Sequence, residues 1–309
     1  YEHFLTMSSP RRFYKNQLQL HQETASNLKK QLFFLSTARL TVFLFTITSV
    51  YFLAPSWLLM VVAGLIGASA FLFLLSKYTS TKQKRALHLA HIKINQEELR
   101  ILTKDFYHRQ SGEEFKDSNH FFSLDIDLFG KGSFFQYLNR TVIIEGAKKL
   151  SELLLSNAID NIKLRQDAIG ELSKKPKWIH EYSATASLAD IETPASLIIQ
   201  WLKSHKPFIP KAMGWIPWMF SGLSIILLVL ASLQIIPIDY FGYWLILGLL
   251  ITGYYLKKVN LLSFNCDKAK ATFKQYAALL NQIENANFSS ELLKQKQAQI
   301  KSDKLKASQ

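Results

Sequence analysis

The stretch Leu40–Leu75, LTVFLFTITSVYFLAPSWLLMVVAGLIGASAFLFLL, decides the class of this protein. It contains no Asp, Glu, Lys, Arg or His, and Pro55 with Ser56 divides it into two apolar runs, Leu40–Ala54 and Trp57–Leu75. An uncharged run of this length is apolar on every face, which is typical of helices in lipid and rare in soluble cores. The stretch therefore predicts two membrane helices joined by a tight turn.

The first run, Leu40–Ala54, has 15 residues. A hydrocarbon layer of about 30 Å needs about 20 helical residues, so this run is too short by itself. Extending the helix back through Phe33 and Phe34 supplies the missing length. Arg39 then falls inside the extended span, and we expect its long side chain to reach the lipid headgroups.

A second pair of apolar runs, Trp215–Ile236 and Tyr240–Leu256, follows with a turn at residues 237–239. None of the four runs contains a charged residue or histidine. This disfavours a transporter, because an ion or solute pathway usually has such groups inside the membrane. We therefore predict a mainly α-helical protein with four transmembrane helices in two hairpins. The aromatic residues near the ends of the second pair, typical of membrane interfaces, are Trp215, Trp218, Tyr240, Tyr243, Trp244, Tyr254 and Tyr255.

Basic residues flank the runs on one side only, since both hairpin turns lack Lys and Arg. Positive residues prefer the cytoplasmic side of a membrane. We therefore expect a multi-pass protein of the cytoplasmic (bacterial-type inner) membrane with both termini in the cytoplasm. The expected parts are an N-terminal cytoplasmic helix (1–38), a first transmembrane hairpin (39–76), a cytoplasmic helical region (77–212), a second transmembrane hairpin (213–256) and a basic cytoplasmic helical segment (257–309).

The composition agrees with a membrane protein that also has polar parts. Of the 309 residues, 49% are hydrophobic and 19% are charged, against about 25% charged in soluble domains. The net charge of +14 indicates either nucleic-acid binding or the cytoplasmic flanks of membrane helices. Cys266 is the only cysteine, which excludes an internal disulfide and a cysteine-based metal site.

The positive charge is densest at the C-terminal end. Residues 257–309 hold 10 Lys and Arg against 4 Asp and Glu, whereas residues 76–211 hold 21 against 16. Such a segment suits the phosphates of membrane lipid or of double-stranded DNA bound without sequence specificity. The candidate phosphate contacts are Lys257, Lys258, Lys294, Lys296 and Lys301.

Several polar segments have helical periodicity. Residues 14–35 carry a heptad seam that fits either a coiled coil or a helix packed on its neighbours. Glu145–Leu155, Asn161–Leu172 and Phe273–Ile283 predict further helices, and Phe121–Phe129 predicts an extended segment. The seam consists of Tyr14, Leu18, His21, Ala25, Leu28, Leu32 and Leu35.

The sequence shows no catalytic arrangement. Residues 130–133, GKGS, lack the spacing of a phosphate-binding P-loop, and we interpret them as a turn that starts a helix. Asp125 and Asp127 have no third metal ligand in the sequence nearby, and we interpret His88 and His91 as a surface pair. We predict no catalytic residue, cofactor or metal in this chain, and do not expect it to be an enzyme by itself.

One block has a more specific pattern. Residues 123–172 read SLDIDLFGKGSFFQYLNRTVIIEGAKKLSELLLSNAIDNIKLRQDAIGEL. This block resembles the helical core, or lever, region of the MutS family of DNA mismatch repair proteins. That family carries an SL…LN.T.T..G...L…L pattern followed by a helix reading I..RQ.AI.EL. The matching positions, which we interpret as structural, are Ser133, Leu138, Asn139, Thr141, Gly146, Leu150, Arg165, Gln166, Ile169 and Leu172.

With apolar runs on both sides of the block, the chain resembles a membrane-anchored branch of that family. The resemblance implies a homodimer formed through a nucleotide-binding domain absent from this chain, which would bind ATP and magnesium and close around DNA. This chain would be the non-catalytic lever and anchor. The Phe-x-Glu element that reads mismatches in the soluble enzyme has no match here.

A second hypothesis belongs to another class. The chain would be a membrane scaffold or sensor whose cytoplasmic helices bind a protein partner, with no nucleic-acid role. The reading frame after residue 309 distinguishes the two, because only the first hypothesis expects a P-loop there.

Overall fold

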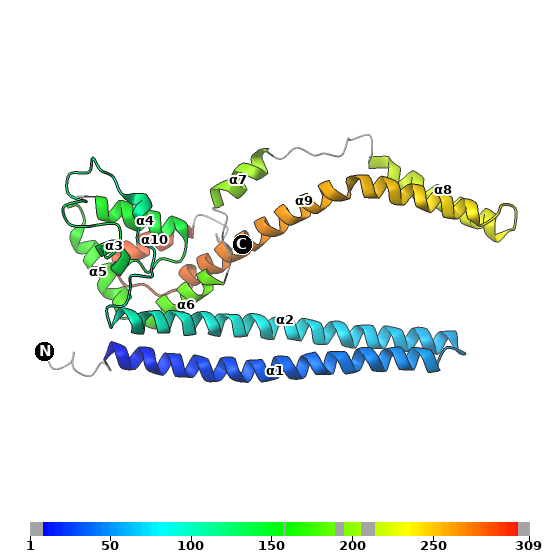
Figure 1. Cartoon of the computed structure of the whole chain (residues 1–309), viewed down its shortest axis with the longest axis horizontal. Coiled ribbons are helices and arrows are strands. Elements are labelled where there is room, and N and C mark those ends of the chain that lie inside the picture. The colour runs from blue at the N-terminus through cyan, green and yellow to red at the C-terminus, as the bar shows by residue number, and fades with distance from the viewer. Residues whose placement is uncertain (1–8, 157–158, 189–194, 205–213, 302–309) are drawn as a thin grey trace. The chain divides into compact units, whose positions relative to one another are not determined.

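The computed structural model describes residues 9–156, 159–188, 195–204 and 214–301. These residues are mainly helical and contain no β-strand (Figure 1), so the predicted helical class is confirmed. The extended segment expected at Phe121–Phe129 is wrong, because the backbone turns repeatedly there. The Leu128 N–H donates to the Ser123 carbonyl at 3.0 Å, and Asp127 has a positive φ of 46°, which is incompatible with a strand.

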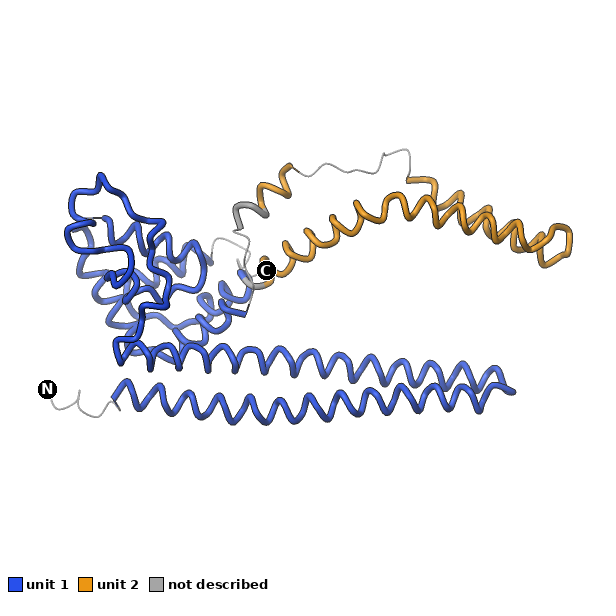
Figure 2. The backbone as a smooth tube through the Cα atoms, viewed as in Figure 1, with its two compact units in different colours: residues 1–190, 275–309 blue, residues 191–274 orange. Residues whose placement is uncertain are grey.

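The chain forms two compact units, residues 1–190 with 275–309 and residues 191–274 (Figure 2). Three of the expected segment boundaries, after residues 38, 76 and 256, fall inside uninterrupted helices. At these positions the composition changes from polar to apolar or back, but the helix continues without interruption. The remaining boundary, between residues 212 and 213, lies outside the described residues.

Two long helices, α1 (Pro10–Phe52) and α2 (Trp57–Ile101), pack as an antiparallel hairpin (Figure 1). Residues 53–56 form the connecting turn, in which the Ser56 N–H donates to the Leu53 carbonyl at 3.0 Å. The tight turn predicted between the first two apolar runs is therefore confirmed.

The heptad seam of α1 packs against α2. Its seven predicted residues are all buried or half-buried, and the same spacing continues into the apolar half through Arg39, Val42, Thr46 and Ser49. A period of 3.5 residues keeps one stripe of a helix on its partner, as in a coiled coil. The helices approach closely at Gly67 of α2, where an added Cβ would lie 2.1 Å from the Thr46 hydroxyl oxygen.

A small helical body packs at the polar end of this hairpin. Its core holds Leu128, Phe129, Phe135 and Ala147. The helices predicted at residues 145–155 and 161–172 are confirmed to within one residue. The body contains the 3-10 helix η2 (Glu113–Phe115), α3 (Phe134–Leu138), α4 (Ile144–Leu155), α5 (Ile162–Ser173), α6 (Pro176–Ser187) and α10 (Glu291–Ile300).

The second unit contains α7 (Ala195–Ser204), α8 (Ile216–Ser232) and most of α9 (Asp239–Glu284). α8 and α9 are in contact, since Phe220 stacks on Trp244 with ring centroids 4.5 Å apart. The Trp244 indole N–H also donates to the Ser224 hydroxyl at 3.0 Å. α9 includes the helix predicted at residues 273–283 and ends just before Asn285.

Three helices, α1, α2 and α9, are long and apolar enough to cross a membrane. Their apolar stretches leave large side chains on the surface: Phe52 is 77% exposed, Trp57 72% and Phe73 70%. Extended apolar surface of this kind is unfavourable in water and favourable in lipid. The fold is therefore consistent with membrane association. α8 is also apolar but has only 17 residues.

Candidate functional site

The glycine-rich turn of the MutS-like block starts a helix, as predicted. Gly130 and Gly132 have positive φ angles of 108° and 80°, which residues with a Cβ rarely adopt. Ser133 then caps α3, because its hydroxyl accepts the Gln136 N–H at 3.1 Å. The Gly132 N–H is already bonded to the Gln136 side-chain oxygen at 2.7 Å, so this turn supports the fold and does not present a phosphate cradle.

Gln136 is a buried polar residue that the sequence analysis missed. It is 2% exposed, and its amide nitrogen donates to the carbonyls of Tyr107 and Arg109 at 3.1 and 2.6 Å. Its side chain therefore joins α3 to the loop that follows α2. A polar residue next to Phe135 in an otherwise apolar short helix was the only available signal.

The central part of the block is held by a local network of hydrogen bonds. Asn139 is buried, and its side-chain oxygen accepts from the Thr141 N–H at 2.9 Å and from the Thr141 hydroxyl at 2.7 Å. The Asn139 carbonyl accepts from the Arg109 guanidinium. Gly146 lies against Thr141, since an added Cβ there would approach the Thr141 Cβ to 3.3 Å. These positions fix the start of α4 and carry no free reactive group.

Of the other positions in the family pattern, some have packed side chains and others have exposed ones. Leu150 packs against the core of the body, and Leu172 is half-buried. Leu138 is 39% exposed and Ile169 67% exposed, and Gln166 is also on the surface. The Arg165 guanidinium donates to the Asp160 carbonyl at 2.7 Å.

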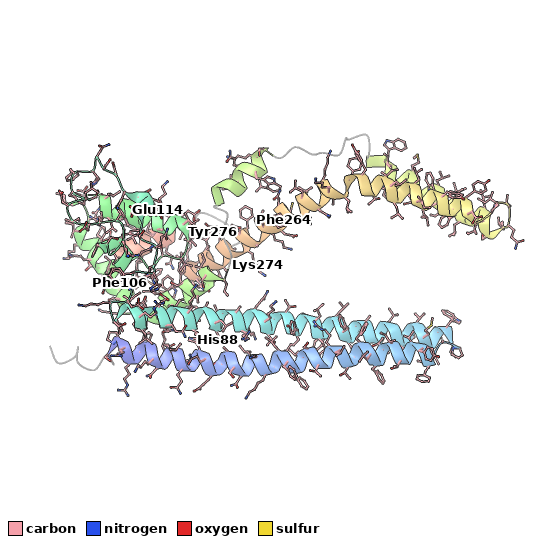
Figure 3. All side chains as sticks on the ribbon, in the orientation of Figure 1. His88, Phe106, Glu114, Phe264, Lys274 and Tyr276 are labelled. Carbon is pink, nitrogen blue, oxygen red and sulfur yellow. The ribbon has the colours of Figure 1, made fainter. Side chains whose placement is uncertain are left out.

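A cluster of histidines joins α1, α2 and α6, and it corrects the interpretation of His88 and His91 as a surface pair. His91 is 5% exposed and His88 is half-buried. The Nδ1 atoms of His21 and His88 lie 2.8 Å apart, and the rings of His21 and His91 stack with centroids 4.2 Å apart. In Figure 3 the labelled His88 lies between α1 and α2. The sequence did not predict that His21 joins this cluster, because it lies 67 residues from His88 and reaches α2 only when the hairpin folds.

The histidine cluster continues onto α6. His91 Nε2 lies 2.8 Å from the Glu181 carboxylate, and the His180 ring stacks on Tyr14 of α1 with centroids 5.6 Å apart. His180 is buried. Four imidazoles thus occupy the junction of three helices, with Glu181 as the carboxylate bonded to one of them.

Burial and neighbouring imidazoles lower the pKa of His21, His88 and His180 and so favour their neutral forms. The pKa of His21 is lowered to about 4, first by burial and then by the neighbouring His91 and His88. Burial likewise lowers the pKa of His88, with His91 adding to the effect. The pKa of His180 is also lowered, mainly by burial. His21, His88 and His180 therefore resist protonation more than a free histidine does.

Glu171, at the end of the MutS-like block, ties α5 to the start of α10. Its carboxylate accepts the backbone N–H groups of Ser289 and Ser290 at 2.8 and 2.7 Å, and the Lys175 ammonium at 2.7 Å. These hydrogen bonds hold the pKa of Glu171 well below its usual range, and the bond from Lys175 has the largest effect. A carboxylate at this place caps the exposed amides of a helix N-terminus from another helix.

The five candidate phosphate-binding lysines are exposed, but they belong to two units. Lys257 and Lys258 lie on α9 in the second unit, and Lys294, Lys296 and Lys301 lie on or just after α10 in the first. Each group is a basic surface by itself.

Within the described residues, no group of three or more His, Cys, Asp or Glu side chains could hold a metal ion. Asp125 and Asp127 are both exposed, and Cys266 is an exposed free thiol on α9.

No protein-family model, no curated protein and no solved structure matches this chain. The comparisons therefore give no support to the MutS-like pattern that the sequence predicts at residues 123–172.

Proposed function

We propose that this chain is the membrane anchor and lever of a larger MutS-like, DNA-associated protein. The observation that supports the lever is the continuity of α2. Its first half is the apolar stretch that begins at Trp57, and its second half contacts α6 and ends at the body. At 1.5 Å per residue, its 45 residues extend about 68 Å. A displacement of the body would therefore move the membrane half of the same helix.

The proposed topology has four membrane crossings with both termini and the body in the cytoplasm. α1, α2 and α9 have sufficient length. α8 would complete the fourth crossing with about 26 Å of helix and the flanking residues of the turn, since short spans thin the bilayer at modest cost. The support is the absence of Lys and Arg from both hairpin turns.

Cysteine accessibility tests this topology. In a Cys266→Ser background, Ser56→Cys and Gln234→Cys place thiols in the two turns, and Lys131→Cys places one in the body. A membrane-impermeant maleimide added to spheroplasts should label the two turns, and should label Lys131→Cys only after permeabilisation. Protection of Gln234→Cys in intact spheroplasts would show that α8 does not cross.

The DNA role rests on the MutS-like block and on the exposed basic surfaces. Contacts to phosphates alone would give binding that ignores sequence and weakens with salt. ATP and magnesium would belong to the nucleotide-binding domain outside this chain, through which the protein would dimerise.

Binding of the detergent-purified chain to matched and mismatched duplexes across a salt series tests this role. We expect equal affinity for both duplexes and a steep loss with salt. Replacing Lys294, Lys296 and Lys301 with glutamine should reduce the log–log salt slope by about 0.9 for each lost contact. The matched control is the triple glutamine variant of Lys15, Lys29 and Lys30. If the chain does not bind DNA at low salt, its basic residues serve lipid contact and membrane orientation, and the DNA role of this chain is wrong.

A scaffold or sensor that binds a protein partner is the second candidate. The exposed apolar residues of the body favour it, because Phe121 is 72% exposed and Ile126 57%. A P-loop in the reading frame after residue 309 would support the first candidate, and an unrelated domain there would support the second.

A further inference from the structure

An apolar recess lies on the α1–α2 hairpin where its polar half meets its apolar half. It has a volume of about 430 Å³, and its lining includes Arg39 together with Phe33, Phe43 and Phe71. It lies wholly on α1 and α2, so it belongs to one unit. The recess combines one guanidinium with three aromatic side chains.

Arg39 occupies a seam position of α1 and is half-buried. Its guanidinium lies 5.1 Å from the Tyr78 ring centre and 5.8 Å from that of Phe71, both on α2. These cation–π contacts hold the guanidinium in place but do not neutralise its charge. No ion pair of Arg39 with a carboxylate occurs among the residues that the structure describes.

The hairpin offers Arg39 no acidic partner within reach, because its acidic residues, Glu23, Glu97 and Glu98, all lie in its polar half. Residues 24–96 contain no Asp or Glu at all, although they contain eight Lys and Arg residues. A guanidinium at a low-dielectric boundary is costly unless an anion accompanies it. The counter-charge at Arg39 must therefore come from outside the hairpin.

The depth of Arg39 identifies the source of that anion. The helix from Arg39 to the end of α1 at Phe52 spans about 20 Å, which is less than the hydrocarbon thickness of about 30 Å. With the turn at the far interface, the Arg39 backbone lies inside the layer and its guanidinium extends toward the near headgroups. Phosphate oxygens at that level fit the planar donor fork of arginine.

We propose that Arg39 and the surrounding aromatic recess bind one anionic phospholipid, with the phosphate on the guanidinium and an acyl chain against Phe33, Phe43 and Phe71. This inference rests on the proposed membrane insertion. The apolar wall selects a lipid over free phosphate, since Phe33 is 77% exposed and Phe43 49% exposed and free phosphate would cover neither.

The test is lipid retention by the full chain. The chain is purified in mild detergent, mixed with phosphatidylglycerol or phosphatidylcholine, and examined by native mass spectrometry. We expect the wild type to retain phosphatidylglycerol preferentially. Arg39→Gln should reduce that retention about fivefold, which corresponds to about 1 kcal/mol for one basic residue at a lipid surface, and Arg39→Lys should recover part of it.

Lys15→Gln is the matched control, because it removes the same charge from an exposed position of the same helix. It lies 24 residues, or about 36 Å, from Arg39, well beyond a Debye length of about 10 Å. Retention by Lys15→Gln should therefore equal that of the wild type. An equal loss in both variants would reduce the effect to general charge and overturn the site.

Two further arms separate the possible failures. Inorganic phosphate that displaces the phosphatidylglycerol at equal concentration would overturn the lipid assignment. Alkaline carbonate extraction of membranes tests insertion independently: wild type and Arg39→Gln should both stay in the pellet. Release of the wild type would overturn the proposed membrane anchor, whereas a retained Arg39→Gln variant with unchanged phosphatidylglycerol binding would overturn only this inference.

Discussion

At the residue scale, the histidine cluster forms only because the hairpin brings together residues that are far apart in the sequence. The facing Nδ1 atoms of His21 and His88 are 2.8 Å apart, so one must carry a hydrogen and the other must accept it. Protonating both rings would direct two N–H groups at each other. The titratable groups beside the cluster are Glu181 at His91, Glu98 near His180, and Tyr14, which stacks on His180.

Acid should destabilise this junction. The pKa of folded His21 is about 4, whereas an unfolded histidine titrates near 6.5. Between these pH values the unfolded chain binds a proton that the folded chain does not, so the free energy of unfolding falls as pH drops from 6.5 toward 4 and is level above that window. Thermal unfolding in detergent at pH 7.5 and pH 5 measures the effect, and His21→Gln should reduce the difference.

Glu171→Gln is the control for that measurement. The pKa of Glu171 is lowered in the folded chain from its ordinary value of 4.5, so its stabilisation is lost only as pH falls below that value, which is below both measured pH values. The midpoint difference between pH 7.5 and pH 5 should therefore persist in Glu171→Gln. An unchanged difference in both His21→Gln and His88→Gln would contradict the assignment to the cluster.

Gln136 carries a second prediction at this scale. Gln136→Ala would leave the Gly132 N–H and the carbonyls of Tyr107 and Arg109 without their partner. Each buried polar group left unpaired costs about 1–3 kcal/mol, so we expect a loss of about 2 kcal/mol or more in chemical unfolding of the body. Lys131→Ala, at an exposed position in the same turn, should change stability by less than about 0.5 kcal/mol. Equal losses in both variants would contradict this role.

At the element scale, the α1–α2 hairpin depends on small residues in its apolar half. In lipid there is no hydrophobic driving force between helices, so close van der Waals packing must hold membrane helices together. Gly67 supplies that closeness at Thr46. The seam residues Val42, Thr46 and Ser49 are also short, and this permits the approach.

Gly67→Leu should therefore separate the two helices. An added Cβ at Gly67 would meet the Thr46 hydroxyl at 2.1 Å, whereas at Gly64 the nearest atom is Val50 Cγ2 at an ordinary 4.0 Å. Overpacking of this kind costs about 1–3 kcal/mol. The thermal midpoint in detergent should fall for Gly67→Leu and change little for Gly64→Leu. Equal behaviour of the two variants would show that the helices do not approach at Thr46.

At the scale of the whole molecule, the continuity of α2 decides whether the body and the membrane half of the hairpin move together. A rigid helix transmits displacement, and a kink absorbs it. Lys82 lies on the exposed side between the two halves, so a change there tests the backbone without disturbing the seam.

Lys82→Pro should uncouple the two halves. Proline removes a backbone hydrogen bond and kinks the helix, at a cost of about 3 kcal/mol. Spin labels introduced by Leu59→Cys and Lys93→Cys in a Cys266→Ser background would lie about 51 Å apart along a straight helix. Pulsed electron paramagnetic resonance should give a narrow distance distribution for Lys82→Ala and a broader, shorter one for Lys82→Pro. Identical distributions would contradict the lever.

The sequence by itself determined the helical class, the first hairpin turn, the α1 seam and the bounds of α4 and α5. These features depend on local signals: uncharged runs, the period of apolar residues, and turn residues such as Pro55. A local signal also predicts the start of α3 after Gly132, because glycine adopts a positive φ without steric cost.

Only the tertiary structure decided which distant residues meet. His21 reaches His88 because two long helices fold back on each other, and Glu171 reaches Ser290 because α5 packs beside α10. No periodicity records such pairings, since they depend on where the chain turns and not on neighbouring residues. The extended segment predicted at Phe121–Phe129 is wrong for the same reason. Phe122, Leu128 and Phe129 pack into the core of the body, and hydrogen bonds such as that from the Leu128 N–H to the Ser123 carbonyl satisfy the backbone without a strand.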